Sequence, residues 1–207
     1  MSLQDFTSEL TDVFEKSKLY LVPWLIALSV LWIINILNWI TGSKLRMFGI
    51  YPRHFWGLIG IFISPFIHQN FNHLFFNSIP LFVLGLILLA RSPDIFLEVT
   101  LGVILLGGLL VWLFGRLALH IGASGVVSGY FGYILATAYF EPSFTTAVIA
   151  ALVIYYFGSI FLGIFPQEDK ISWESHLFGF LSGIACAFAP EKLWSFFKVL
   201  EQTFKMN

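Results

Sequence analysis

Residues 122–140 read GASGVVSGYFGYILATAYF, and this stretch decides the fold class of the chain. It holds no charged residue and ends before Glu141-Pro142. A helix needs about 20 apolar residues to cross the hydrocarbon core of a bilayer, so the stretch predicts a membrane helix. Its glycines, Gly129 and Gly132 among them, are typical of a face that packs closely against another membrane helix.

The composition places the whole chain in the same class. Of its 207 residues, 58% are hydrophobic and 11% are charged, and the mean hydropathy is +0.85. Such a chain is too apolar for one soluble domain, and its apolar runs are long enough to cross a membrane. The net charge of -1 leaves no basic surface for phosphates, which excludes a nucleic-acid partner. The sequence therefore predicts an all-α polytopic membrane protein.

Six apolar runs predict a bundle of six transmembrane helices that occupies residues 19–190. The runs are 19–40, 73–90, 95–114, 124–140, 144–165 and 172–188. The end segments, 1–18 and 191–207, place apolar residues at helical spacing among charges and predict two helices in the membrane interface. We expect both termini in the cytoplasm, although Lys and Arg are divided almost evenly between the two sides.

The segment 42–72 is the longest interruption between the runs, and it is not hydrophilic. It is rich in Phe, Ile and Gly and contains Trp56, Pro52 and Pro65. We expect a structured loop that folds onto or partly into the membrane face and leads His68 to the second span.

Polar side chains cluster where the second span begins. His73 and Asn77 are four residues apart, so both project from one face of the first helical turns and can donate to one oxygen. His68 lies five residues before His73, off that face, and we expect it to bond loop backbone. This pattern lacks the glutamate and the spacing of a zinc motif. Cys186 is the only cysteine, which excludes an intramolecular disulfide.

Ser124 lies in a glycine-flanked turn where the fourth span begins. Gly122 and Gly125 let the backbone approach a substrate closely, and the free N–H groups of a helix start can bind an oxyanion. These features suit a nucleophile in acyl transfer. The same pattern of small residues also occurs in helices that only pack closely.

His176 starts the sixth span and favours the catalytic interpretation. Gly179 and Gly183 follow it at three and seven residues, so a glycine-lined stripe runs down the helix from the imidazole. We expect this stripe to press on the small face of the fourth helix. His176 then comes within reach of Ser124 as its general base.

The three motifs together resemble the rhomboid family of intramembrane serine proteases in order and spacing. They are His68-x4-His73-x3-Asn77, Gly122-x-Ser124-Gly125 and His176-x2-Gly179-x3-Gly183. The resemblance implies a dyad of Ser124 and His176 without a third acid. It further implies an oxyanion hole from the Ser124 N–H and the side chains of His73 and Asn77. It implies membrane-spanning helices as substrates, no cofactor and no metal.

Two positions depart from the family's pattern. The family's Trp-Arg pair in the first loop is replaced by Ile59-Gly60, with Arg53 and Trp56 nearby but out of register. The aromatic residue on which the family's catalytic imidazole stacks is replaced by Ser128. Tyr130, Tyr133 or Trp173 can supply another surface, or Ser128 can bond the ring. Glu174 is expected to be a solvated loop charge.

A second class stays open, a catalytically silent rhomboid-like protein that binds or escorts membrane helices. Such relatives typically lose the serine or the histidine, which this chain keeps. A transporter is disfavoured, because the chain has no inverted pair of broken helices and no inward row of carboxylates. We expect a multi-pass protein of the plasma membrane of a bacterium. The oligomeric state and the identity of the substrate stay open.

Overall fold

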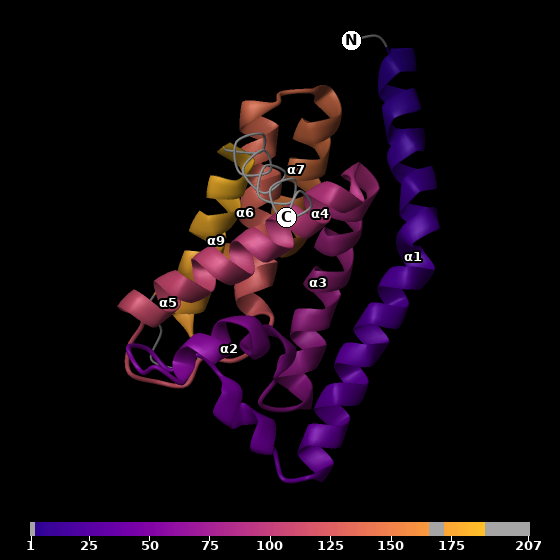
Figure 1. The fold of residues 1–207 in the computed structure, drawn as a ribbon. Coiled ribbons are helices and arrows are strands. Elements are labelled where there is room, and N and C mark those ends of the chain that lie inside the picture. Colours follow the sequence, from indigo (N-terminus) through magenta and orange to yellow (C-terminus); the bar gives the residue numbers. More distant parts are fainter. Residues whose placement is uncertain (1–2, 166–171, 189–207) are drawn as a thin grey trace, which may run out of the picture.

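The protein is built from helices. The computed structural model describes residues 3–165 and 172–188, and these contain no β-strand, only an isolated bridge between Ile50 and His120 (Figure 1). The longer helices are α1 (Leu3–Ile40), α3 (Phe71–Arg91), α4 (Pro93–Gly102), α6 (Ser124–Phe140), α7 (Phe144–Phe157) and α9 (Trp173–Phe188). Shorter ones are η1 (Lys44–Phe48), α2 (Gly57–Ile63), η2 (Ser64–Phe66), η3 (Val103–Gly107), α5 (Gly108–Phe114) and α8 (Ser159–Leu162). The predicted all-α polytopic fold is confirmed.

Each of the six predicted spans corresponds to a helix or to consecutive helices. By length and composition, three stretches of the described chain are long and apolar enough to cross a bilayer: Phe6–Ile40, Phe71–Arg91 and Pro93–Phe114. α6, α7 and α9 are shorter and complete the bundle. In Figure 1, α1 and α3 stand side by side and α9 runs along α6.

α1 is a single helix where the sequence analysis expected two. Its 38 residues rise about 57 Å at 1.5 Å per residue, well beyond a hydrocarbon core of about 30 Å. No break occurs at the predicted border between residues 18 and 19, so an interfacial role for residues 1–18 stays a prediction. The ring of Phe6 packs on Phe144 at 4.6 Å, which brings the first turns of α1 against α7. The predicted C-terminal helix, 191–207, lies outside the described residues.

Two predicted spans are interrupted. The third contains a π-helical turn, η3, where Gly107 approaches the main chain of α9 near Gly179. The fifth ends as α7 and continues as the short α8 after Gly158. Such local changes of helix geometry depend on close contacts between helices, which the apolar pattern of one span does not record.

The first loop is structured, as predicted. Ile50 exchanges two backbone hydrogen bonds of 2.9 Å with His120. Ile61 of α2 is buried with Val111 of α5. Phe55, Trp56, Ile59, Phe62 and Phe66 are exposed on the outer side of the loop, which suits contact with lipid.

α6 and α9 are packed backbone to backbone. A Cβ atom on Gly179 would overlap the carbonyl oxygen of Gly125, and one on Gly183 would overlap that of Gly129. On α6, a Cβ on Gly132 would come within 2.5 Å of the Phe180 oxygen. The glycine stripes predicted for the fourth and sixth spans therefore face each other.

Gly183→Ala should destabilise the fold, although alanine favours an isolated helix by about 1 kcal/mol. The added methyl group would push α9 away from Gly129, at a cost of about 1–3 kcal/mol for overpacking. A lower melting temperature in detergent is the expected result. Ala185→Leu is the matched control, because Ala185 is exposed on the same helix. A Gly183→Ala protein as stable as the wild type would contradict the packing.

Candidate active site

Three helix starts lie at one end of the bundle, together with the first loop. They are the N-terminal turns of α3, α6 and α9, which carry His73 and Asn77, Ser124, and His176. In Figure 1 this is the end farthest from the N-terminus of α1. The polar residues singled out from the sequence are thus gathered from three distant parts of the chain.

His73 and Asn77 face the turn that precedes Ser124. Gly122 has φ +113°, and a Cβ there would lie 2.6 Å from His73 Nε2 and 3.5 Å from Asn77 Nδ2. Only glycine suits both this backbone conformation and this close approach. Asn77 Nδ2 is buried and has no hydrogen-bond partner within the described part of the chain. An unpaired donor therefore points to the space beside the Ser124 turn.

The hydrogen bonds of His73 determine which ring nitrogen carries its proton. The main-chain N–H of Gln69 donates to His73 Nδ1 at 3.4 Å. Nδ1 is then an acceptor, and in the neutral ring the proton is on Nε2, the nitrogen nearest Gly122. The side chain of Asn70 caps α3 and accepts from the His73 N–H at 2.9 Å. His73 is thereby oriented as a second donor beside Asn77.

His68 is hydrogen-bonded to the turn that precedes Ser124. It is fully buried, and its Nε2 accepts a hydrogen bond from the N–H of Ala123 at 3.1 Å. This agrees with the expectation that His68 bonds backbone. Burial, and then the neighbouring His73, lowers the pKa of His68 from 6.5 to about 3. The ring is therefore neutral at physiological pH, as an acceptor at Nε2 requires.

Asn35 is a supporting residue that sequence reasoning missed. Its side chain accepts from the N–H of His68 at 2.7 Å and donates to the oxygens of Phe66 and Leu31, each at 2.9 Å. It is fully buried in α1. An asparagine within the last turns of an apolar span was the available signal, since buried polar groups in a membrane need partners.

His176 is held by the main chain of the segment before it. Its Nδ1 lies 2.9 Å from the carbonyl oxygen of Gly163. Because a carbonyl only accepts, Nδ1 carries the proton and Nε2 keeps its lone pair, the form that a general base needs. A Cβ on Gly163 would lie 2.6 Å from Nδ1, so the glycine permits this contact.

Ser124 and His176 come from neighbouring turns without a direct bond. A Cβ on Gly125 would lie 3.2 Å from the oxygen of Ser175, so the residues next to the pair are in contact. Among the described residues, no hydrogen bond joins Ser124 to His176. Catalytic hydrogen bonds are often long without substrate and tighten when it binds.

The sequence suggested four side chains as partners of the His176 imidazole, and the structure places them in different surroundings. Tyr130 is buried and bonds Thr100 at 2.6 Å, on the side of α4. Tyr133 lines a cavity toward the other end of α6. Ser128 Oγ is buried and makes no hydrogen bond in the described residues, so it does not bond the ring. No ring contact of Trp173 occurs within the described chain.

Glu174 is not the solvated charge that the sequence suggested. Its side chain is 3% exposed and pairs with Arg116 Nε at 3.2 Å, with the Arg116 N–H as a second donor at 3.2 Å. The carboxylate is thus engaged at the start of α9 by the loop before α6. Sequence spacing alone did not reveal this partner 58 residues away.

Arg53 secures the first loop at a position out of register with the family's Trp-Arg pair. Its guanidinium donates to the oxygens of Leu113 and Gly115 at 3.1 and 2.8 Å, at the C-terminal end of α5. A cation is favourable there because helix carbonyls are unpaired. Trp56 is exposed.

A small recess lies beside the serine turn. Its volume is about 40 Å³, and Ser64, Gly122, Gly125 and Ser175 are among the residues that line it. Such a recess admits a small side chain or a water molecule. No group of three potential metal ligands occurs in the described residues.

The chain is similar in sequence to a known protein family and to bacterial proteins. The Rhomboid domain family matches residues 52–190. An uncharacterized protein of Mycobacterium tuberculosis (strain H37Rv) is 34% identical over 176 residues, 79% of this chain and 73% of the relative. An uncharacterized protein of Mycobacterium leprae is 31% identical over 177 residues, which are 80% of this chain and 70% of the relative. These relatives are bacterial, in agreement with the predicted multi-pass protein of a bacterial plasma membrane.

The stability of the protein should fall as the pH drops below 6.5. The unfolded chain binds a proton at His68 near that pH, whereas the folded chain does so only near the lowered pKa of about 3. The contribution of the neutral His68 ring to the free energy of unfolding is complete above pH 6.5. It is lost as the pH falls toward 3. By pH 5 the loss from His68 is roughly 2 kcal/mol, at 1.4 kcal/mol per pH unit.

Melting temperatures at pH 7.5 and pH 5 check this. His68→Gln keeps an acceptor for the Ala123 N–H without titrating, so its melting temperature should depend less on pH. His54→Gln is the control, because His54 is exposed. Equal pH dependence in His68→Gln and the wild type would contradict the assignment.

Proposed function

Because the chain belongs to the rhomboid family, we propose that it is an intramembrane serine endopeptidase that cleaves the transmembrane helices of other membrane proteins. One observation carries the proposal. His176 has its Nδ1 proton engaged by Gly163 and its Nε2 free, in a helix packed on the one that begins with Ser124. That is the arrangement in which an imidazole can act as base for a serine.

The reaction begins when His176 Nε2 takes the proton of Ser124 Oγ. The oxygen attacks the scissile carbonyl carbon, and the electron pair of the carbonyl moves to its oxygen. When the tetrahedral intermediate collapses, the C–N bond breaks and His176 gives the proton to the leaving amine. A water molecule, activated by the same imidazole, then hydrolyses the acyl-enzyme.

The negative charge of the intermediate needs donors that are already in place. Asn77 Nδ2 is buried without a partner, and His73 Nε2 is the protonated nitrogen beside Gly122. Together with the Ser124 N–H, they form the proposed oxyanion hole. Preorganised donors of this kind stabilise the transition state without reorganisation.

The site favours substrates with small residues at the scissile bond. A peptide bond in a helix has its carbonyl hydrogen-bonded, so attack requires local unwinding, which Gly, Pro and Ser make easier. The recess of about 40 Å³ beside Gly122 and Gly125 also limits the size of a side chain next to the nucleophile.

The alternative function is a catalytically silent protein that binds or escorts membrane helices. The missing hydrogen bond between Ser124 and His176 in the described residues is the observation that favours it. The retained donors Asn77 and His73 favour the enzyme. A buried amide is normally hydrogen-bonded, and binding a membrane helix does not require an unpaired one.

Asn77→Ala should slow cleavage about a hundredfold or more, from the loss of about 2 to 4 kcal/mol of transition-state stabilisation. Substrate binding should barely change, because the oxyanion forms only during the reaction. Turnover and binding are measured with a purified membrane substrate. Asn72→Ala is the control, since Asn72 is exposed on the same turns of α3. A variant that binds poorly yet cuts bound substrate at the normal rate would refute the role.

Ser124→Ala and His176→Ala should each abolish cleavage, and the double variant should be no worse than either, because nucleophile and base act as a unit. A fluorophosphonate probe should label the wild type at Ser124 and neither variant. Ser128→Ala is the control, because Ser128 lies one turn further along the same helix. If Ser124→Ala still cleaves, or if the folded wild type binds membrane helices but neither cuts them nor reacts with the probe, the escort function replaces the protease.

A further inference from the structure

A row of polar side chains joins the loop before Ser124 to the first turn of α9. His120, four residues before Ser124, is hydrogen-bonded through Nδ1 to the hydroxyl of Ser172. The hydroxyl of Ser172 lies 2.6 Å from that of Ser175, the residue before His176. These three side chains, the His120 link, connect the segment of the proposed nucleophile to that of the proposed base. The proposed reaction uses none of them.

The direction of each hydrogen bond in the His120 link follows from the carbonyl group at one end. His120 Nε2 lies 3.1 Å from the main-chain oxygen of Arg116, which only accepts, so Nε2 carries the proton. Nδ1 of the neutral ring is then an acceptor, and the hydroxyl of Ser172 donates to it. The oxygen of Ser172 is left to accept from the hydroxyl of Ser175. Each proton of the His120 link therefore has one defined place.

His120 is buried at a position that favours the neutral ring. It is 2% exposed, and burial lowers its pKa, which the backbone bond to Arg116 and the carboxylate of Glu174 only partly oppose. A neutral ring keeps Nδ1 available as an acceptor for Ser172. Glu174 also pairs with Arg116 at 3.2 Å, so a second contact joins the same two segments.

The backbone of His120 is held by the first loop. Its N–H and carbonyl groups exchange hydrogen bonds of 2.9 Å with Ile50. Ile50 is itself buried with Ile61 and Val111. His120 thus has a fixed main chain on one side and a hydroxyl of α9 on the other, which makes it a suitable anchor for the start of that helix.

The first turn of α9 depends on contacts of its own. The backbone contacts at Gly179 and Gly183 both come after His176 along the helix. Among the described residues, no hydrogen bond joins Ser124 to His176, so the contacts around this pair determine its separation. The His120 link is such a contact, because it ends at the residue before His176.

We propose that His120 is a positioning residue, which holds the first turn of α9, and with it the imidazole of His176, in register with Ser124 through the hydroxyls of Ser172 and Ser175. Where it concerns catalysis, this role rests on the proposed function. His120 acts through the two serines and exchanges no proton with the substrate. A displacement of about 1 Å can slow positioned chemistry about a hundredfold, so a loosened first turn lowers kcat more than it changes KM.

Two variants at His120 separate the link from the bulk of the ring. The side-chain oxygen of His120→Asn lies near the place of Nδ1 and can accept from Ser172, whereas His120→Gln extends toward the Arg116 oxygen and leaves Ser172 without this acceptor. Both variants are neutral and smaller than histidine. With a purified membrane substrate, kcat should fall about tenfold in His120→Gln and much less in His120→Asn, with KM unchanged. Equal losses in the two variants would overturn the proposal.

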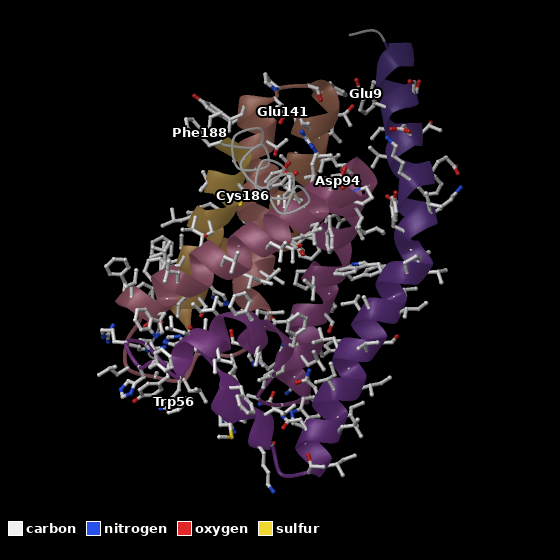
Figure 2. The ribbon with its side chains drawn as sticks, in the orientation of Figure 1. Glu9, Trp56, Asp94, Glu141, Cys186 and Phe188 are labelled. Carbon is white, nitrogen blue, oxygen red and sulfur yellow. The ribbon has the colours of Figure 1, made fainter. Side chains whose placement is uncertain are left out.

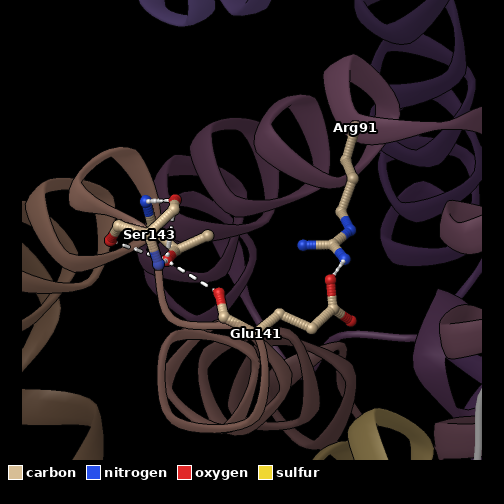
Figure 3. A network of polar contacts seen from close by, with 4 residues as sticks. Arg91, Glu141 and Ser143 are labelled. Atoms are coloured by element: carbon tan, nitrogen blue, oxygen red, sulfur yellow. Dashed lines mark hydrogen bonds and ion pairs between the residues drawn. The ribbon is translucent and has the colours of Figure 1, made fainter. Parts of the chain in front are cut away.

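Ser172 needs a matched control, because it also caps α9. Its Oγ accepts from the main-chain N–H three residues on, at 3.4 Å. Ser143 is a cap of the same kind at the other end of the bundle. Figure 2 shows its neighbour Glu141 at the end of the molecule opposite Trp56. Ser143 caps α7 by accepting from the Thr146 N–H at 3.0 Å (Figure 3).

Ser172→Ala and Ser143→Ala should lower the melting temperature by similar amounts, since each removes one helix cap. Only Ser172→Ala should lower kcat, by about tenfold, and Ser172→Thr should recover it because the hydroxyl is kept. Ser172→Ala combined with His120→Gln should be no slower than either alone, since both break the same link. Losses of kcat that add up, or that neither Ser172→Thr nor His120→Asn recovers, would show a general packing effect and refute the positioning role.

A measurement without substrate separates this role from the proposed function. Amide hydrogen exchange in residues 175–178 should be faster in His120→Gln, which keeps the Ser172 cap, than in the wild type and His120→Asn. If the wild type cuts no membrane protein, the protease fails, while faster exchange in His120→Gln still supports the link. If exchange in these residues is the same in all three proteins, the link is wrong whether or not the protein is a protease.

Discussion

The backbone contact between α6 and α9 is the constraint on which the candidate site depends. Gly125 and Gly129 present their carbonyl oxygens to Gly179 and Gly183, with no side chain between the helices at these two contacts. Within a bilayer, helices associate through such close packing, because lipid is as apolar as their side chains. Ser124 and His176 occupy the first turns of these two helices, so this contact determines their separation. A shift of about 1 Å there is enough to impair positioned chemistry.

The three histidines of the candidate site, His68, His73 and His176, differ in the backbone group to which each ring is hydrogen-bonded. His68 and His73 accept from the N–H groups of Ala123 and Gln69, which leaves the proton on the other ring nitrogen. His176 instead faces the carbonyl of Gly163 at Nδ1, which leaves Nε2 unprotonated. In the proposed reaction the same side chain therefore serves as a support at His68, as a donor at His73 and as a base at His176. Neutral rings suit this environment, where a charged imidazole would be costly.

α6 joins two polar sites at opposite ends of the bundle. Ser124 begins the helix, and Thr137 lies more than three turns further, in the wall of the cavity that Tyr133 also lines. Residues 126–134, between Ser124 and Thr137, are buried.

Periodicity and spacing were enough to predict the spans and the motifs. A membrane segment must satisfy its own backbone hydrogen bonds, so apolar length alone predicts a helix. His73 with Asn77, and Gly179 with Gly183, share a helix face by spacing. The break at Gly158, the π-helical turn, the burial of Glu174 and the role of Asn35 were not predicted. Each arises from a contact with a distant part of the chain.

The sequence by itself determined that the chain crosses the membrane as a helical bundle, and which residues are candidates for its chemistry. Only the tertiary structure decided which ring nitrogen of His73 and His176 carries the proton, because Gln69 and Gly163 make those contacts through backbone atoms. It also decided that Asn77 is an unpaired donor and that a cavity forms around Thr137. Protonation and cavities depend on how several helices pack together, and no single segment contains that information.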